Sequence, residues 1–195
     1  ENVPSGQKYL KMIINAMKEG KMLEMEYQTF KDTPAFKVVL APYCVKLFKQ
    51  RWYVVGKTAD RHTLGIFCLD RINSLLQTLR SFKMPEKFDA KEYFNDWFGI
   101  VHDERYYKPE IIRLKVWDRQ RHYFNTLPPH DSQKEVETHK DWSIFEYYMA
   151  PTWDLEMDLL QYNDCVEVLE PQSLREAMIE HINNMKDVYD GKYNE

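Results

Sequence analysis

The N-terminal part of the chain combines one helical pattern with several strand-like patterns. In residues 7–18, apolar side chains recur every three or four positions, which predicts a helix that Ser5 would cap and Gly20 would end. In residues 22–30, apolar and polar residues alternate, with Tyr27 among the apolar ones, as in a strand with one buried face. A helix that leads directly into a strand is therefore expected.

Further short strands are predicted downstream. The pattern places them over 36–48, 51–59 and 63–79, where the last stretch is long enough for one strand or two. Turns are expected at 32–34 and 60–62, and Pro42 should force a bend or an edge position. One helix followed by about five short consecutive strands indicates a small, curved antiparallel β-barrel.

The second half has a different order of elements. Residues 81–88 are a predicted linker, 89–100 a short helix capped by Asp89, and 102–109 an aperiodic boundary. The pattern then predicts a strand at 111–117, a helix at 118–127, a hairpin of two strands at 131–139 and 142–150, a helix at 153–162 and a strand at 165–171. This β-α-β-β-α-β order is that of a ferredoxin-like fold. We therefore expect an α+β protein with a barrel domain at 1–88, a short helix and linker at 89–108, and a ferredoxin-like domain at 109–195.

Two helices of the second half have predicted apolar faces. In the helix at 153–162, Trp153, Met157 and Leu160 should share one face. A terminal helix should open with a capping box formed by Ser173 and Glu176. Its apolar stripe is expected to pack on a core rather than to bind a partner, and consists of Leu174, Met178, Ile182, Met185 and Tyr189.

Charge is distributed unevenly between the two halves. Residues 1–88 hold 15 Lys and Arg against 8 Asp and Glu, a net charge of +7, whereas residues 89–195 hold 12 against 23, a net charge of −11. A basic half beside an acidic half suggests two units with different partners, although a more basic solvated surface alone would give the same sum.

Composition excludes several classes of protein. No apolar run approaches the roughly 20 residues of a membrane helix, so we expect no membrane partner. The three cysteines are odd in number and widely spaced, which indicates a reducing, cytoplasmic location without a disulfide framework. The six histidines are scattered, so we predict neither a metal site nor a cofactor.

No catalytic motif is visible, and we predict that the chain is not an enzyme. Cys44, Cys68 and Cys165 lie in apolar strand patterns, which favours buried structural thiols over a nucleophile in a spatially assembled Cys–His pair. The acidic run with Asp154 and Asp158 should form a solvated helix face, because its members fan apart on a helix.

One stretch, from Arg51 to Arg71, has a distinctive pattern. On strand 51–57, Arg51 and Tyr53 point to one side, while Trp52 and Val54 point to the other and should face the core. Arg71 follows in an apolar strand pattern, where an unpaired arginine is costly.

Two explanations of Arg71 remain open. It could face an anionic ligand with flat bases, since a guanidinium fits phosphate and an aromatic side chain stacks on a base. Alternatively, it could pair with a glutamate such as Glu24 or Glu26. Its neighbour Asp70 should point to the opposite face and need not be its partner.

At these residues the sequence resembles the WYL-domain family of bacterial transcriptional regulators. The naming tripeptide appears as Trp52-Tyr53-Val54. Other segments match in order and spacing over nearly the whole chain: the leading helix, Tyr27, Pro42, Leu69-Asp70-Arg71-Ile72 and residues 92–100. Residues 129–133 and 166–171 are similar to segments of the family's C-terminal extension domain.

The resemblance implies an SH3/Sm-like barrel that senses a nucleotide or single-stranded nucleic acid in a basic pocket. By position, Tyr53 and Arg71 would line that pocket, and the weaker candidates are Tyr27, Lys46, Arg51 and His62. Many relatives carry further basic residues where this chain has Gly65 and Cys68. The ferredoxin-like extension is associated in the family with dimerisation and with relay of the ligand signal.

Our prediction is therefore the ligand-sensing and dimerising part of a regulator. Such proteins carry a winged helix-turn-helix ahead of the WYL domain, so duplex DNA would be bound only through that absent domain. Two alternatives stay open: a stand-alone accessory or oligomerisation module without a nucleic-acid ligand, and a small hydrolase or transferase that uses a Cys–His pair.

Overall fold

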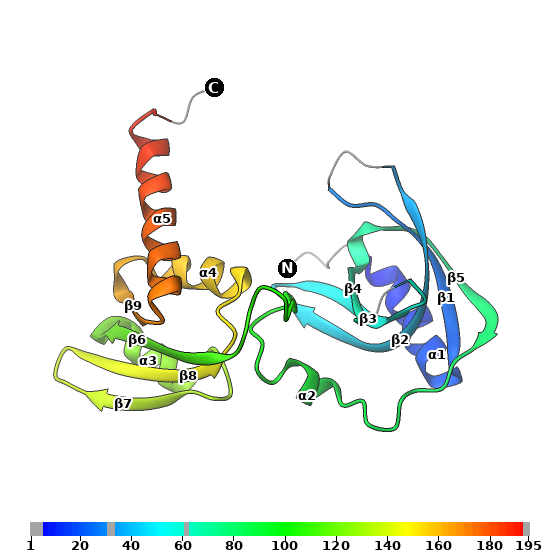
Figure 1. Cartoon of the computed structure of the whole chain (residues 1–195), viewed down its shortest axis with the longest axis horizontal. Coiled ribbons are helices and arrows are strands. Elements are labelled where there is room, and N and C mark those ends of the chain that lie inside the picture. The colour runs from blue at the N-terminus through cyan, green and yellow to red at the C-terminus, as the bar shows by residue number, and fades with distance from the viewer. Residues whose placement is uncertain (1–5, 31–33, 61–62, 193–195) are drawn as a thin grey trace. The chain divides into compact units, whose positions relative to one another are not determined.

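The computed structural model describes residues 6–30, 34–60 and 63–192. Within these ranges the chain is a mixed α+β protein with two antiparallel sheets, as predicted (Figure 1). It divides into two compact units, Glu1–Ala90 and Lys91–Glu195, which are described separately below.

The first unit is built on one five-stranded sheet. Its strands lie in the order β4-β3-β2-β1-β5. A single turn, Gln7–Tyr9, precedes α1, and the elements are α1 (Leu10–Glu19), β1 (Lys21–Tyr27), β2 (Phe36–Phe48), β3 (Arg51–Thr58), β4 (Gly65–Cys68) and β5 (Ile72–Ser81). The predicted helix and the strand at 36–48 are thus confirmed.

The core of this unit lies between α1 and the sheet. Ile13 of α1 is fully buried, and the alternation predicted for β1 is confirmed because Leu23, Met25 and Tyr27 are buried. α1 ends at Gly20, as expected, in a left-handed conformation with φ of 62°. A side chain at this position would be strained by the left-handed backbone, and its Cβ atom would lie 2.9 Å from the carbonyl oxygen of Phe82.

Several predictions for the first unit need correction. β1 ends at Tyr27 rather than at residue 30. The pattern at 63–79 is interrupted by a helical turn, Leu69–Arg71, between β4 and β5, so Arg71 does not lie in a strand. Of the two outcomes expected at Pro42, the edge position is wrong because β2 is the central strand of the sheet, whereas the register irregularity between Pro42 and Cys44 agrees with a bend. Ser5 and most of the two predicted turns fall outside the described residues.

The second unit contains a four-stranded sheet in the order β7-β8-β6-β9. A helical turn, Leu160–Cys165, follows α4 and contains Cys165, which is half-buried rather than in a strand. The elements are α2 (Ala90–Phe94), β6 (Glu110–Trp117), α3 (Asp118–Thr126), β7 (Lys134–Thr138), β8 (Trp142–Met149), α4 (Trp153–Leu159), β9 (Val166–Glu170) and α5 (Gln172–Tyr189). The predicted element order is confirmed, although α2 is much shorter than residues 89–100.

α4 buries a different face from the one predicted. Trp153 is 53% exposed, whereas Leu155, Leu159 and Asp154 are buried. The Asp154 carboxylate accepts hydrogen bonds from the N–H groups of Ile100 (2.7 Å) and Val101 (2.9 Å). Asp154 is therefore a structural anchor rather than part of a solvated face.

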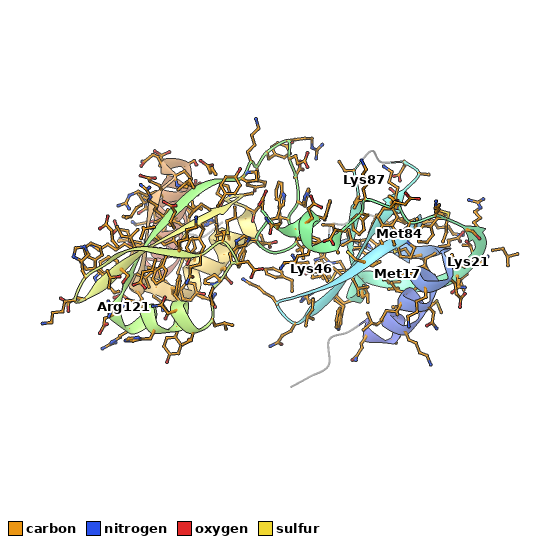
Figure 2. The ribbon with its side chains drawn as sticks, turned by 90° about the horizontal axis from the view of Figure 1, so that it is seen from below. Met17, Lys21, Lys46, Met84, Lys87 and Arg121 are labelled. Carbon is orange, nitrogen blue, oxygen red and sulfur yellow. The ribbon has the colours of Figure 1, made fainter. Side chains whose placement is uncertain are left out.

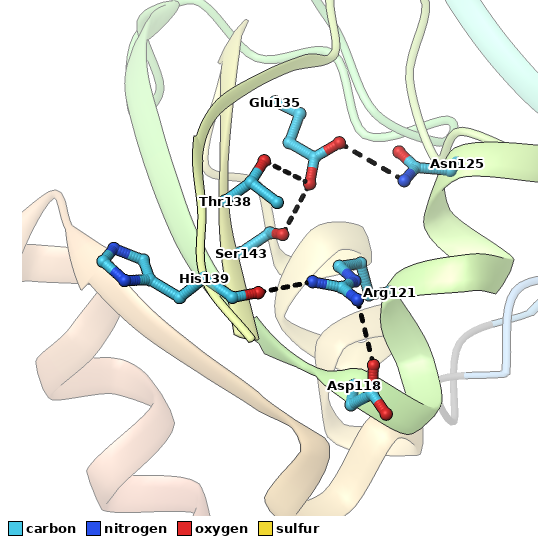
Figure 3. Close-up of polar contacts among 7 residues, drawn as sticks. All are labelled: Asp118, Arg121, Asn125, Glu135, Thr138, His139 and Ser143. Atoms are coloured by element: carbon cyan, nitrogen blue, oxygen red, sulfur yellow. Dashed lines mark hydrogen bonds and ion pairs between the residues drawn. The ribbon is translucent and has the colours of Figure 1, made fainter. Parts of the chain in front are cut away.

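A polar network links the β7–β8 hairpin to α3 (Figure 3). Glu135 accepts hydrogen bonds from Ser143, Thr138 (3.0 Å) and Asn125 (3.3 Å). The guanidinium of Arg121 donates to the carbonyl oxygen of His139 at 2.8 Å, which closes the hairpin against the helix.

The predictions for α5 also need correction. Its N-cap is Pro171 and no side-chain cap is formed, so the capping box with Ser173 is wrong. Glu176 instead accepts a hydrogen bond from the side chain of Gln172 at 2.9 Å. Leu174 is buried, but the rest of the stripe is not, since Ile182 and Met185 are about half exposed. The stripe therefore does not pack fully on its own core.

Candidate functional site

The candidate site begins on β3, whose two faces differ. Val54 is buried in the core of the first unit, and Trp52 packs against that core from the same face. Arg51 and Tyr53 lie on the opposite face, as the alternation predicts. Tyr53 is nevertheless only 8% exposed, so this face is covered as well.

The strand register places two further residues beside Tyr53. Lys46 of β2 lies directly opposite Tyr53 on one side, and Cys68 of β4 lies opposite it on the other. Directly opposed residues of antiparallel strands share a face, so Lys46, Tyr53 and Cys68 form a row across the sheet. Lys46 comes from the second half of β2 (Figure 2).

Tyr27 contacts Cys68, one end of this row of residues. Its hydroxyl oxygen accepts a hydrogen bond from the N–H of Cys68 at 3.2 Å. Its ring packs edge-on against Phe67 and Phe36, at centroid distances of 5.2 and 5.9 Å. Burial raises the pKa of Tyr27, although the hydrogen bond from Cys68 opposes that shift. Tyr27 therefore belongs to the core and reaches the site only through its hydroxyl group.

Among the described residues, Arg71 is held by its backbone and by no carboxylate. Its carbonyl oxygen accepts a hydrogen bond from the N–H of Gln28 at 3.0 Å. The guanidinium carbon lies 4.1 Å from the centre of the Phe30 ring, a cation–π contact. Its Nε atom is buried and has no hydrogen-bond partner within the described part of the chain.

The glutamates proposed as partners of Arg71 are engaged elsewhere. Glu24 forms an ion pair with Lys37 at 3.4 Å, and Glu26 accepts a hydrogen bond from Ser74 at 3.5 Å. Arg71 therefore pairs with neither of these two glutamates.

Arg51 has a carboxylate partner that the sequence did not reveal. It forms an ion pair with Oδ2 of Asp70, whose side chain is only 12% exposed. The second oxygen of Asp70, Oδ1, is buried without a hydrogen-bond partner in the described residues. The same turn thus presents one buried acceptor and, on Arg71, one buried donor that have no hydrogen-bond partner in the part of the chain that the structure describes.

Burial dominates the electrostatics of the site. It raises the pKa of Tyr53 to about 12, with a smaller contribution from Cys68, while Arg51 and Arg71 oppose the shift. It raises the pKa of the Cys44 thiol to about 11, against the influence of Lys46, and it also raises the pKa of Cys68. These thiols favour the protonated form, which is a poor nucleophile.

The structure thus brings together Tyr53, Tyr27, Arg51 and Arg71, with Lys46 in the same row, while His62 lies outside the described residues. Sequence reasoning missed Phe30 and the role of Asp70. Nothing in the local pattern indicates the contact of Phe30 with Arg71 or the pairing of Asp70 with Arg51, which lies 19 residues away in the sequence. Among the described residues there is no group of three or more His, Cys, Asp and Glu side chains that could hold a metal ion.

Comparison with known proteins identifies both units. The WYL-domain family model matches residues 8–76, and the WCX-domain family model matches residues 108–186. Curated protein sequences give no match. No helix in the described ranges is long and apolar enough to cross a membrane.

Two solved structures resemble the chain. A crystal structure of a CRISPR Cas-related protein is 12% identical, with a TM-score of 0.52, and the match covers 97% of this chain and 52% of that one. Proteasome accessory factor B/C (PafBC) of Arthrobacter aurescens is 18% identical, with a TM-score of 0.44, and the match covers 91% of this chain and 27% of that one. This chain therefore spans about half or less of the length of these structures.

Proposed function

Since the chain belongs to the WYL-domain family and combines a WYL domain with a WCX domain, we propose that its first unit is a regulatory sensor of an anionic ligand. The observation that carries this proposal is the state of Arg71. Its Nε atom is buried and unpartnered in the described chain, and its guanidinium lies against Phe30. A buried donor without an acceptor destabilises the folded protein, and a bound anion that accepts its hydrogen bond would remove that cost.

The chemistry around Arg71 favours a nucleotide or a single-stranded nucleic acid. A guanidinium donates two parallel hydrogen bonds to phosphate, and exposed aromatic rings offer stacking surfaces to bases. Phe30 is 76% exposed and supplies such a ring. The proposed ligand-binding residues are Tyr53, Arg71, Tyr27, Arg51, Lys46 and His62.

We also propose finer fold assignments for both units. In the first, β5 pairs with β1 at the far end of a β1-β2-β3-β4 meander, which supports an SH3/Sm-like barrel at 1–88. In the second, the order β7-β8-β6-β9 supports a ferredoxin-like domain at 109–195, because the first strand of that fold lies between the third and the fourth. Residues 89–108 would be the short helix and linker.

We propose that these units form the ligand-sensing and dimerising portion of a bacterial transcriptional regulator. In this proposal the protein is cytoplasmic and not an enzyme, which agrees with the raised pKa values of the Cys44 and Cys68 thiols.

Fluorescence anisotropy with a labelled single-stranded DNA oligonucleotide tests the ligand. We expect binding that weakens as salt is added, because phosphate contacts release counterions. Arg71→Ala should abolish most of the binding, and Arg71→Lys should restore little, because an ammonium group lacks the planar fork.

The matched control is Arg80→Ala, which removes the same charge from an exposed position of β5. It should leave binding nearly unchanged. Equal losses in Arg71→Ala and Arg80→Ala would mean that only net charge matters, and the site would be rejected. If the wild-type chain binds no oligonucleotide at low salt and mononucleotides do not bind either, the accessory module without a nucleic-acid ligand replaces this proposal.

A further inference from the structure

The sheet of the second unit has one face covered by helices and one face that is more open. α3 packs on the covered face, where the ring of Phe124 lies 5.6 Å from that of Phe145, and Leu114 and Val116 are buried there. The residues that alternate with these on β6 and β8 point to the other side of the sheet. This side, which we call the open face, carries Arg113, Lys115 and Trp117 on β6 and Trp142, Glu146 and Tyr148 on β8.

Aromatic side chains lie on the open face of both central strands. β6 and β8 are in the middle of the order β7-β8-β6-β9, and Trp117 lies directly opposite Trp142 in their register. The side chain of His139 points away from α3 (Figure 3), and its ring stacks on Trp142 at a centroid distance of 3.7 Å. Tyr148 is 48% exposed further along β8. These planar rings offer stacking surfaces to an aromatic ligand.

Lys115 supplies a cation beside these rings. Its ammonium nitrogen lies 4.4 Å from the centre of the Trp142 ring and 4.8 Å from that of Trp117. In the described part of the chain it forms no ion pair, since Glu167, the carboxylate directly opposite on β9, is paired with Arg175 at 2.8 Å. A cation–π contact is weaker than a charge-assisted hydrogen bond to phosphate, so the ammonium is available to an anionic group.

The carboxylates around Lys115 already have partners. Glu146 and Glu170 both pair with Arg113, at 3.0 and 3.4 Å. Glu137 lies 3.5 Å from His139. Most acidic residues of this unit lie instead on its helices and loops. The negative net charge of the unit therefore does not exclude an anionic ligand from the open face.

We propose that the open face is a second nucleic-acid site, where a single strand stacks its bases on Trp117, Trp142 and His139 and pairs a phosphate with Lys115. Four-stranded sheets with aromatic side chains on the central strands bind successive bases in this way. A flat sheet surface suits an extended strand better than a small molecule, because small ligands are usually held in concave pockets. When a base stacks on the indole rings, the flexible stem of Lys115 lets its ammonium move to the phosphate. This site goes beyond the proposed sensor at Arg71 and does not depend on it.

Fluorescence anisotropy with a labelled oligothymidine tests the proposal in the whole chain with Arg71→Ala. This change removes the tighter binding to the first unit, so the binding that remains at high protein concentration reports on the open face. Trp142→Leu should weaken it about tenfold, because one stacked base is lost. Trp142→Phe keeps a ring and should keep most of the binding. Trp153→Leu is the matched control, because Trp153 is 53% exposed on α4 rather than on the sheet, and it should bind normally.

Two further measurements separate stacking from charge. An abasic oligonucleotide of the same length has the phosphates without the bases, so it should bind weakly and quench little of the tryptophan fluorescence that the oligothymidine quenches. Lys115→Gln should weaken binding and lower the salt slope by about one phosphate contact. Lys91→Gln, which removes only an exposed ion pair with Asp131, should change neither.

The outcomes distinguish this site from the sensor at Arg71. Equal binding by Trp142→Leu and Trp153→Leu, equal losses in Trp142→Leu and Trp142→Phe, or equal binding of the abasic strand would each overturn the open-face site and leave the sensor intact. If Trp142→Leu alone abolishes binding while Arg71→Ala by itself has no effect, the open face is supported and the sensor is rejected. A chain with Arg71→Ala that binds no oligothymidine at low salt would overturn the open-face site.

Discussion

Replacement of Asp154 by alanine should destabilise the second unit strongly. The residue is 6% exposed, and its carboxylate accepts hydrogen bonds from the N–H groups of Ile100 and Val101 at 2.7 and 2.9 Å. The loop approaches this closely because Gly99 adopts a φ of +76°, and a Cβ atom there would lie 2.4 Å from the carboxylate. The substitution leaves two backbone N–H groups without their acceptor.

The magnitude follows from these two bonds. A hydrogen bond to a charged group contributes about 1.5–3 kcal/mol, so the loss of both should cost about 3 kcal/mol at the lower end of that range. That cost raises the unfolded fraction roughly a hundredfold. The matched control is Asp131→Ala, because Asp131 forms only an exposed ion pair with Lys91 at 3.8 Å. Such a pair contributes at most about 1 kcal/mol.

Urea unfolding followed by tryptophan fluorescence measures this difference. Four of the five tryptophans lie in the second unit, so the signal reports mainly on the part of the chain that contains Asp154. The midpoint of Asp154→Ala should fall well below those of the wild type and of Asp131→Ala. If the two variants agree within about 0.5 kcal/mol, the two backbone hydrogen bonds do not hold this loop and the reasoning is refuted.

Two further predictions concern the first unit. Burial raises the pKa of Tyr53 to about 12, so the unfolded chain releases the phenolic proton at a lower pH than the folded chain. The free energy of unfolding should therefore fall as the pH rises from about 10. Tyr53→Phe should reduce that slope in urea midpoints measured against pH, and an unchanged slope would contradict the burial. Gly20→Ala should lower the melting temperature more than Gly191→Ala. Both positions have positive φ, but only at Gly20 would the added Cβ atom lie within 4 Å of another atom, the carbonyl oxygen of Phe82.

Much of the fold followed from local periodicity. The bounds of β2 agree with the predicted strand at 36–48, and the alternation of Leu23, Met25 and Tyr27 placed the correct face of β1 in the core. These features depend on neighbours within a few residues, which a sequence displays directly. The placement of Tyr53 and Arg71 in a binding pocket came instead from the resemblance to the WYL-domain family, and it stays a prediction.

Contacts between distant residues decided the rest. The pattern of α4 could not show that Asp154 meets the N–H groups of residues 100 and 101, because that contact joins segments more than 50 residues apart. The pattern could not show the contacts of Arg51 with Asp70 or of Arg71 with Phe30 either, because these pairs also come from separate segments of the chain.

The amphipathic pattern of α5 marks the limit of what the sequence by itself determined. Periodicity establishes that one face of this helix is apolar, and that prediction was correct. It does not establish which surface covers that face, because coverage depends on where the rest of the chain lies. Only the tertiary structure decided that α5 leaves most of its apolar stripe exposed.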